Sequence, residues 1–345
     1  MSGGVDSSVA AALLKKLDYD VTGIFFKPWS PNKNMAFCNW KQDRQDAIRA
    51  CAKLGIPFKT WDFSKEYGKH VARYMIESYR KGITPNPDVM CNKEIKFGLF
   101  LKKALKEGTD FIATGHYVKK SKIEEYKLLK GTDKNKDQSY FLWTLRQKQL
   151  KHCLFPIGDY TKPEVRKLAK KFGLQNHEKK DSQGVCFVGQ LNMKEFLKNY
   201  IKPKIGDIVL GETDKVVGQH DGVYYYTIGQ RHGLDIKDGS GPYFVMSKDI
   251  RKNIIYVTNM PSKLNIKNEI SKIEKVNWVG EVPKLPLNCQ IKIRYRSKSV
   301  PALITKNKKN KTLLIKFKKP VRALTTGQSA VFYRGQEVLG GGIIV

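Results

Sequence analysis

The sequence predicts an α/β fold in three parts: a parallel-sheet domain, a small central domain and an all-β C-terminal domain. Residues 1–200 alternate helical patterns with short apolar runs, which is typical of an α/β domain. Over 201–262 glycine and aromatic residues become more frequent, which indicates a separate central domain. Over 263–345 apolar residues recur with a period of two, as in β-strands that bury one face. A length of 345 residues agrees with two or three domains.

A loop rich in glycine and serine precedes the first predicted helix. Its residues are Ser2, Gly3, Gly4, Val5, Asp6, Ser7 and Ser8. Small residues let backbone N–H groups approach an oxyanion closely, and the helix that follows directs its positive N-terminus to that anion. Unlike a P-loop, this loop has no Lys at its end. It resembles the pyrophosphate-binding loop of the ATP pyrophosphatases, which transfer AMP to a substrate oxygen; an ordinary helix-capping turn is the alternative.

A strand is expected before this loop, because such loops normally follow a buried parallel strand at the carboxyl edge of a sheet. Met1 lies inside the motif, so the first strand of the α/β domain is missing from this sequence. We expect a start that was assigned too late, rather than the loss of a strand. A targeting segment would be missing with it, and no signal peptide or apolar run of about 20 residues is visible.

The remaining elements follow from apolar periodicity and from the residues that begin and end helices. Pro163 and Gly173 delimit one helix, because proline suits the first helical position and glycine the position after the last turn. The predicted elements are strands at 21–26 and 110–117, helices at 44–54, 91–106 and 163–173, and later strands at 222–229, 290–296 and 313–318.

A formal net charge of +32 is far larger than solubility requires and predicts a polyanionic partner, with nucleic acid as the first candidate. The alternative is a compositional bias, because lysine greatly outnumbers arginine, as an AT-rich genome would produce. Lys292, Arg294 and Arg296 alternate with apolar residues, so one face of their predicted strand is cationic and spaced for phosphates. Tyr295 belongs to the other face and is either a core residue or a nucleic-acid contact.

The six cysteines form no CxxC pair, which argues against a zinc knuckle or an iron–sulfur cluster. Structural disulfides are not expected, since the sequence carries no secretory signal. Cys91 follows two prolines and begins a predicted helix near Lys93, a setting that lowers a thiol pKa. Cys186 has glycines on both sides. From these settings alone, the ordinary interpretation of each is a buried, inert thiol, with a catalytic thiol as the alternative.

Seven motifs occur in one order over nearly the whole chain: SGGVDSS, NPDVMCNKEIKF, ATGHY, KDQSYFLW, DSQGVCFVG, YTIGQRHGL and LGGG. Through them the sequence resembles the tRNA-specific 2-thiouridylases, which thiolate the wobble uridine of tRNAs for Lys, Glu and Gln. The resemblance implies an adenine-nucleotide α-hydrolase-like (PP-loop) catalytic domain over 1–200, a small linker domain over 201–262 and a tRNA-binding β-barrel over 263–345.

Cofactors and partners also follow from the resemblance. It implies ATP with Mg²⁺ and no permanently bound metal or cluster. It implies tRNA and a sulfur donor, either a cysteine desulfurase or a sulfur-relay protein, as partners. It further implies a monomer in the cytoplasm that does not associate with a membrane.

The implied activity is that of a tRNA-uridine 2-sulfurtransferase, which releases AMP and pyrophosphate. The C2 oxygen of uracil is a poor leaving group, and its adenylation makes AMP the leaving group. By resemblance Cys186 carries a persulfide, and Cys91 attacks it so that sulfur passes to C2 and a Cys91–Cys186 disulfide remains. A reductant then restores both thiols. Asp6 is the third catalytic candidate.

Binding residues are implied position by position. The residues implied for ATP are Ser2, Gly3, Gly4, Val5, Asp6, Ser7, Ser8, Gly115 and Phe26, which stands where the family usually has Met. The residues implied for the target base are Asn86, Pro87 and Asp88, and those for the rest of the tRNA are Lys136, Asp137, Gln138, Arg294 and Tyr295. No residue is implied as a metal ligand.

Two other functions compete with this interpretation. Other ATP pyrophosphatases, such as GMP or NAD synthetases, need an ammonia source and do not explain two cysteines in motifs, and the two-thiocytidine enzymes need CxxC pairs. A non-catalytic tRNA-binding relative, truncated at its N-terminus, explains the charge and the missing strand. It does not explain an intact SGGVDSS loop together with Cys91 and Cys186.

Overall fold

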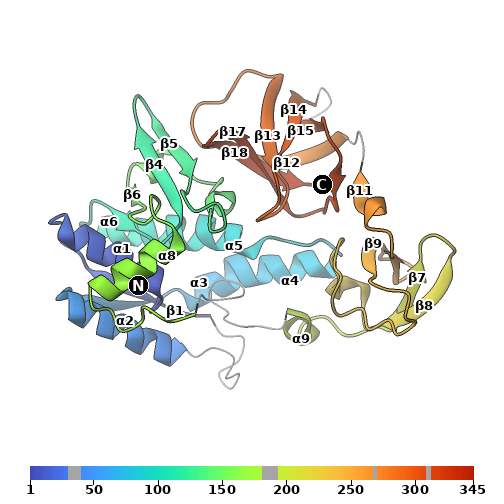
Figure 1. Ribbon diagram of the computed structural model, residues 1–345, viewed down its shortest axis with the longest axis horizontal. Helices are drawn as coiled ribbons and strands as arrows, with labels where there is room; N and C mark the ends of the chain where they lie inside the picture. The colour runs from blue at the N-terminus through green and yellow to red at the C-terminus, as the bar shows by residue number, and fades with distance from the viewer. Residues whose placement is uncertain (30–39, 181–192, 267–269, 308–311) are drawn as a thin grey trace.

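The computed structural model describes residues 1–29, 40–180, 193–266, 270–307 and 312–345. The chain forms an α/β domain, a small central domain and a C-terminal barrel, which confirms the predicted fold class (Figure 1). Among the helices that the structure describes, none is both long and apolar enough to cross a membrane.

The α/β domain contains two pairs of short parallel strands, and helices connect its strands. Its elements are α1 (Val5–Lys16), β1 (Gly23–Lys27), α2 (Trp40–Leu54), β2 (Phe58–Asp62), α3 (Ser64–Tyr67), η1 (Gly68–Ala72), α4 (Arg73–Arg80), α5 (Pro87–Met90), η2 (Cys91–Phe100), α6 (Leu101–Lys106), β3 (Ile112–Ala113), β4 (Val118–Lys122), β5 (Tyr126–Lys130), η3 (Ser139–Phe141), α7 (Gln147–Leu150), β6 (Cys153–Leu154) and α8 (Lys162–Lys171). Strand β1 pairs in parallel with β2, and β3 with β6. Val9 and Ala12 of α1 are buried in one cluster with Val165 and Ala169 of α8, so these two helices pack together.

One continuous helical run replaces the helix predicted over 91–106. It starts earlier, at Pro87, and its middle part η2 has the wider π-helical turn. Proline fits the first helical position, and Asn86 caps the run by accepting a hydrogen bond from Val89 N at 3.2 Å. The π-helical turn begins at Cys91, and such turns are frequent at functional sites.

The central domain contains a mixed sheet in the order β8-β7-β10-β9. Its elements are α9 (Met193–Lys198), β7 (Gly206–Leu210), β8 (Lys215–His220), η4 (Val223–Tyr225), β9 (Phe244–Asp249), β10 (Ile254–Thr258) and η5 (Pro261–Leu264). The strand predicted at 222–229 is wrong, because this segment contains the 3-10 turn η4. Gly222 adopts φ +148°, and Tyr225 and Tyr226 are buried in the core of this domain instead of alternating across a sheet.

The C-terminal domain is a closed barrel. Its elements are β11 (Asn265–Ile266), β12 (Ile270–Trp278), β13 (Leu287–Lys292), β14 (Val300–Lys306), β15 (Leu313–Phe317), β16 (Val321–Arg322), β17 (Ser329–Arg334) and β18 (Glu337–Ile344). Strands β12, β15, β14, β13, β17 and β18 pair in this order, and the β12–β18 pairing closes the barrel. The strand predicted at 290–296 extends too far, since β13 ends at Lys292.

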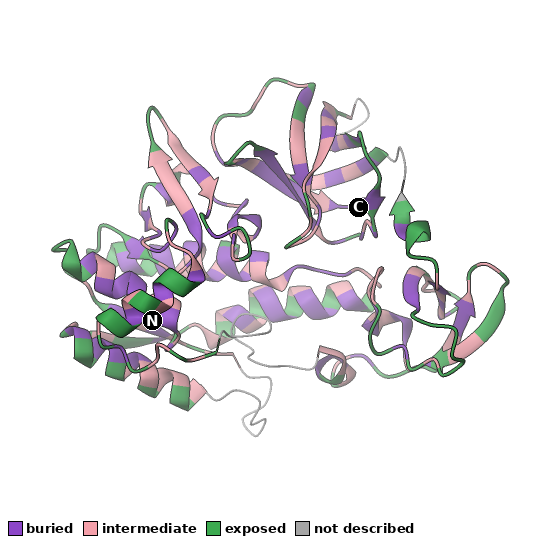
Figure 2. Cartoon of the chain, viewed as in Figure 1, coloured by how far each residue is buried: buried purple, intermediate pink, exposed green. Residues whose placement is uncertain are grey.

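The barrel and the α/β domain share one core. The hairpin β4–β5 continues the barrel sheet through the pair Glu337–Leu129, and Tyr140 Oη and Trp143 Nε1 donate to Ser329 O (2.9 Å) and Oγ (3.0 Å). Figure 2 shows buried residues both in the barrel strands and in the helices of the α/β domain, and one buried cluster contains residues of both. The hairpin also explains why the strand predicted at 110–117 is reduced to β3: the chain leaves the parallel pair after Thr114 and turns into β4.

Candidate nucleotide-binding and thiol site

The SGGVDSS loop forms a turn that its own hydroxyl groups hold. Ser2 Oγ accepts from Gly4 N (3.3 Å), Ser7 Oγ accepts from Ser2 N (3.1 Å), and Ser8 Oγ donates to Gly4 O (3.0 Å). Gly4 is the N-cap of α1, and no side chain among the described residues caps this helix. The first turn of a helix has N–H groups without intrahelical partners, so α1 presents an anion-binding end at the loop. This geometry fits the phosphates of ATP.

Two glycines at the site have backbone atoms of other residues so close that a side chain would not fit, and one of them also has a conformation that favours glycine. Gly3 adopts φ +74°, and a Cβ atom there would lie 2.1 Å from Asp43 O on α2. A Cβ atom at Gly115, just after β3, would lie 2.8 Å from the backbone of Asp6 and from Ser7 N. The structure therefore brings Gly115 against the loop, although more than 100 residues separate them in the sequence.

Asp6 points into a small polar cluster at the start of α1. Its Oδ1 accepts hydrogen bonds from Tyr117 Oη (2.8 Å) and Lys162 Nζ (2.6 Å). Lys162 is only 9 % exposed, whereas the Asp6 side chain is 32 % exposed, so the ion pair is shielded from solvent mainly on the lysine side. Sequence reasoning did not find Tyr117 or Lys162, because neither adjoins the loop in the chain.

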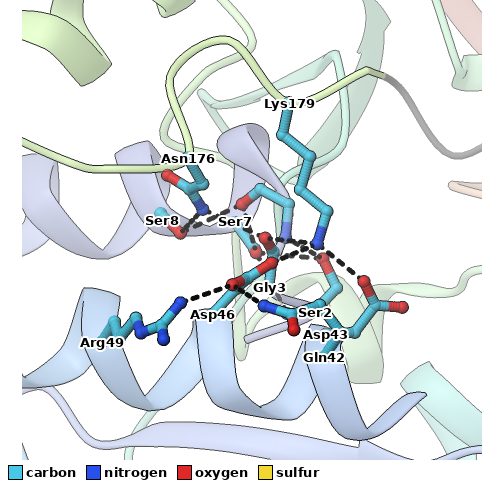
Figure 3. A network of polar contacts seen from close by, with 11 residues as sticks. Ser2, Gly3, Ser7, Ser8, Gln42, Asp43, Asp46, Arg49, Asn176 and Lys179 are labelled. Atoms are coloured by element: carbon cyan, nitrogen blue, oxygen red, sulfur yellow. Dashed lines mark hydrogen bonds and ion pairs between the residues drawn. The ribbon is translucent and has the colours of Figure 1, made fainter. Parts of the chain in front are cut away.

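A second ion-pair network fastens the loop to α2. Lys179 Nζ lies 2.7 Å from Asp43 Oδ1, 2.6 Å from Asp46 Oδ2 and 3.4 Å from Gly3 O (Figure 3). Asn176 Nδ2 also donates to Gly3 O, at 3.1 Å. Although burial opposes it, the hydrogen bond from Lys179 lowers the pKa of Asp46 below its ordinary value. The only sequence signal for this network was the spacing of Asp43 and Asp46, which places both on one face of α2.

Cys91 lies at the junction of α5 and η2. Its side chain is 0 % exposed, in a cluster with Tyr67, Val71 and Ile95. No disulfide joins any two of the cysteines that the structure describes. Cys186 falls outside the described residues, so its persulfide role and its pairing with Cys91 stay predictions.

The segment before Cys91 is held between two domains. Asn86 is buried as the cap of α5, while Pro87 and Asp88 are half-buried. Gln328 Nε2, from the barrel, donates to the carbonyl oxygens of Thr84 (3.1 Å) and Pro85 (3.0 Å). The residues implied for the target base thus lie directly before the Cys91 helix, in a segment that hydrogen bonds from the barrel hold in place. Their contact with a base stays a prediction.

Comparison with known proteins assigns the family. Residues 1–190 match the family model "tRNA methyl transferase HUP domain", residues 194–259 "tRNA methyl transferase PRC-barrel domain" and residues 268–344 "Aminomethyltransferase beta-barrel domain". The chain is 46 % identical over 347 residues to tRNA-specific 2-thiouridylase MnmA of Geobacillus thermodenitrificans (strain NG80-2), with 100 % of this chain and 93 % of that protein covered. The chain belongs to the tRNA-specific 2-thiouridylase family.

Two further relatives agree with this assignment. They are tRNA-specific 2-thiouridylase MnmA 2 of Geobacillus kaustophilus (strain HTA426), 47 % identical over 347 residues, and tRNA-specific 2-thiouridylase MnmA of Bacillus cytotoxicus, 46 % identical over 349 residues. Each match covers 100 % of this chain and 93 % of the relative. The resemblance based on the seven motifs is thereby confirmed.

Asp137 and Gln138, which are implied to contact tRNA, make side-chain hydrogen bonds inside the protein. Asp137 is 6 % exposed and accepts hydrogen bonds from Ser139 N (3.1 Å) and Lys292 Nζ (3.2 Å). Gln138 Oε1 accepts from Tyr117 N at 3.0 Å. Lys136 lines a pocket with Lys134, Asn135 and Arg296, and its backbone N–H donates to Asp133 Oδ1 at 3.2 Å.

Replacing Asp137 by alanine is expected to lower the free energy of unfolding by about 3 kcal/mol, because it leaves a largely buried Lys292 ammonium without its carboxylate. Chemical denaturation measures this loss. Asp159→Ala is the control, since its carboxylate is 79 % exposed and lies 3.7 Å from Lys119 Nζ, and it should change stability by no more than about 0.5 kcal/mol. Equal effects of the two substitutions would contradict a structural role for the Asp137–Lys292 pair.

The cationic strand face predicted over 290–296 is wrong for two of its three members. Lys292 pairs with Asp137, and the Arg294 guanidinium donates to Ala323 O (3.0 Å), Ile228 O and Thr325 Oγ1. The alternation itself continues past the end of β13, because Ile291 and Ile293 are both buried in the barrel core, but Lys292 and Arg294 are engaged by partners from other elements. Arg294 thus joins the barrel to the central domain, and its tRNA contact stays a prediction.

Tyr295 and Phe26 lie in aromatic surroundings. Tyr295 is half-buried, and its ring centroid lies 4.6 Å from that of Phe141. The Arg296 guanidinium lies over the Tyr295 ring, 5.3 Å from the ring centroid. Phe26, on β1, packs against Phe100 with ring centroids 4.7 Å apart. The contacts implied for them, with tRNA and with adenine, stay predictions.

The described part of the chain contains no cluster of side chains arranged to bind a metal ion. Within it, no group of three or more His, Cys, Asp or Glu side chains could hold a metal ion. The two acidic side chains beside the loop, Asp43 and Asp46, are engaged by Lys179.

Proposed function

We propose that this chain catalyses the ATP-dependent 2-thiolation of the wobble uridine in tRNAs of the Lys, Glu and Gln type. The observation that carries the proposal is the loop at the start of α1: it precedes the N-terminus of a helix, which favours an anion, and Gly115 lies against it. The 2-thiouridylase names of the relatives support tRNA as the substrate. Cys91 and the loop both lie within residues 1–190, which match one domain of the family, and this supports a role for both in one reaction.

The first step is adenylation. The C2 oxygen of the uracil attacks the α-phosphorus of ATP, the bond from that phosphorus to the bridging oxygen of the β-phosphate breaks, and pyrophosphate leaves with the electron pair. Mg²⁺, carried by ATP, supplies charge neutralisation on the phosphates. The residues that hold the pyrophosphate part are Ser2, Gly3, Gly4, Ser7 and Ser8. Gly115 and Phe26 contact the nucleoside part.

The second step transfers sulfur. A cysteine desulfurase or sulfur-relay protein loads Cys186 as a persulfide, and its terminal sulfur attacks C2 so that AMP leaves with the C–O electron pair. The Cys91 thiolate then attacks the inner sulfur of Cys186, and the electron pair of the broken S–S bond goes to the sulfur on C2. This forms a Cys91–Cys186 disulfide, which a cellular dithiol or thiol reduces with two electrons. Asn86, Pro87 and Asp88 orient the base, and a reducing compartment, the cytoplasm, suits a cycle of this kind.

The alternative of an N-terminally truncated, non-catalytic tRNA-binding relative is the weaker one. All three domains of the family match this chain, and hydrogen bonds within the loop hold its turn. The two functions differ in one product: only the enzyme releases pyrophosphate. We expect the purified chain to release pyrophosphate from ATP when unmodified tRNA-Lys is added, and to release none with a tRNA that lacks a wobble uridine. Absence of tRNA-dependent release would contradict the proposal.

Affinity for tRNA is expected to fall steeply with salt, because phosphate contacts release counterions. With about six phosphates contacted, the loss is about 10³-fold between about 50 and 200 mM monovalent salt. Filter binding with tRNA at several salt concentrations measures the slope. A flat slope would mean that the net charge of +32 is a compositional bias without a role in binding.

A further inference from the structure

Two carboxylates of α2 lie beside the loop that is expected to bind a polyphosphate. Asp43 and Asp46 are three positions apart, so both lie on one face of this helix. Gly3 packs directly against the helix, because a Cβ atom at Gly3 would lie 2.1 Å from Asp43 O. Figure 3 shows Asp43 and Asp46 beside Ser2 and Gly3 of the loop. Charges of like sign repel, so two free carboxylates at this place would oppose the binding of an anion.

Lys179 supplies a positive charge between these two acids. Its Nζ lies 2.7 Å from Asp43 Oδ1 and 2.6 Å from Asp46 Oδ2. Although burial opposes it, hydrogen bonds to both carboxylates raise the pKa of Lys179 above its ordinary value. The ammonium group is therefore protonated at neutral pH. It reduces the negative charge that the face of α2 presents to the loop.

The ammonium group is positioned by the rest of the domain as well as by the two acids. Arg166 Nη2, from α8, donates to Lys179 O at 2.9 Å. Asn176 Nδ2 donates to Gly3 O (3.1 Å) and to Ser8 Oγ (3.0 Å). Lys179 Nζ itself lies 3.4 Å from Gly3 O. The segment that carries Lys179 is thus bonded both to α8 and to the loop.

The ion pairs by themselves contribute little to the stability of the fold. The side chains of Lys179 and Asp43 are 31 % and 40 % exposed, and pairs with this exposure are weakened by solvent. Removal of the lysine would therefore change the fold little. It would, however, leave two uncompensated carboxylates next to the anion site, so the larger expected consequence lies in anion binding.

We infer that Lys179 sets the affinity of the loop for polyphosphate by neutralising Asp43 and Asp46, which would otherwise repel the anion. The inference rests on the proposed function for the identity of that anion, which is the pyrophosphate part of ATP. Lys179 is a positioning residue, because it acts through the two carboxylates and the Gly3 carbonyl oxygen. It gives up no proton during the reaction.

The first test is the affinity of the full chain for inorganic pyrophosphate, measured by titration calorimetry without Mg²⁺, tRNA or a sulfur donor. Lys179→Met is expected to weaken this affinity at least about tenfold in about 0.1 M salt. The loss should shrink in about 1 M salt, because salt screens the repulsion. Lys180→Met removes the same charge from the exposed neighbouring residue and should change the affinity by no more than about twofold. An unchanged affinity in a folded Lys179→Met protein would overturn the inference.

Removal of the two acids separates charge neutralisation from a merely structural role. In the Lys179→Met background, Asp43→Asn and Asp46→Asn together are expected to restore the affinity to within about threefold of the wild type, because the repelling charges are gone. A structural role predicts no recovery, and a folded triple variant without recovery would contradict the inference.

The two proposals also fail separately. A wild-type chain that thiolates tRNA while the triple variant shows no recovery overturns only this inference. Recovery of pyrophosphate affinity in a chain whose wild type does not thiolate tRNA overturns only the proposed function.

Discussion

Replacing Cys91 by serine is expected to abolish thiolation of tRNA while tRNA-dependent release of pyrophosphate continues. Serine is close to cysteine in size, so the buried position in the cluster with Tyr67 and Ile95 stays filled and the helix keeps its course. A hydroxyl group cannot take the place of a thiolate that attacks a persulfide. The nucleotide loop at α1 is not altered, so adenylation proceeds. Cys186→Ser is expected to give the same separation of the two activities.

Cys153→Ser is the matched control for both cysteine variants. Cys153 is as buried as Cys91 and lies in the same domain, on β6, where burial raises its pKa to about 12, but it lies outside the seven motifs and no role in sulfur transfer is implied for it. It should retain thiolation. Thiolated tRNA is measured on a gel that retards it, and pyrophosphate in a coupled assay. Normal thiolation by Cys91→Ser would contradict the assignment of Cys91 to sulfur transfer.

Replacing Gly3 by alanine is expected to weaken ATP binding on the order of 100-fold. The new Cβ atom would push the loop about 1 Å away from the position in which it binds the nucleotide. Gly3 has φ +74°, a conformation that costs other residues about 1 kcal/mol, and its Cβ would lie 2.1 Å from Asp43 O. That oxygen belongs to the backbone of α2 and cannot rotate away. ATP affinity is measured by titration calorimetry on the folded variant.

Gly218→Ala is the control for Gly3→Ala. A Cβ atom at Gly218, on β8 of the central domain, would meet side-chain atoms at 3.5 Å and 3.7 Å, which is ordinary van der Waals contact. This variant should bind ATP as the wild type does. If Gly3→Ala also bound ATP normally, the loop at α1 would not be the nucleotide site.

Local sequence signals predicted the parts of the site that depend on neighbouring residues. The loop from Ser2 to Ser8 and the helix after it could be predicted because small residues, a helix start and an apolar run follow one another directly. Pro163 and Gly173 delimited the second helix at the site to within a few residues. The family motif implied a nucleotide contact at Gly115, and the structure shows that Gly115 lies against the loop, where there is no space for a Cβ atom.

The rest of the site depends on pairs that are distant in the chain. Lys162 reaches Asp6 over 156 positions and Lys179 reaches Asp43 over 136, and no local pattern marks either lysine among so many others. The same limit explains the error at Lys292 and Arg294. Alternation predicted a cationic surface, but an acidic or carbonyl partner from another element draws a charged side chain inward when it lies close enough.

The most direct test of the central claim is the thiolation of an unmodified tRNA-Lys transcript by the purified chain. The transcript is incubated with ATP, Mg²⁺, cysteine and a cysteine desulfurase, and then separated on a gel containing an organomercury compound, which retards thiolated RNA. A retarded band that requires both ATP and this chain, and that disappears with Cys91→Ser but not with Cys153→Ser, is the expected result. A folded chain that binds the transcript but gives no retarded band would contradict the account and favour a non-catalytic tRNA-binding protein.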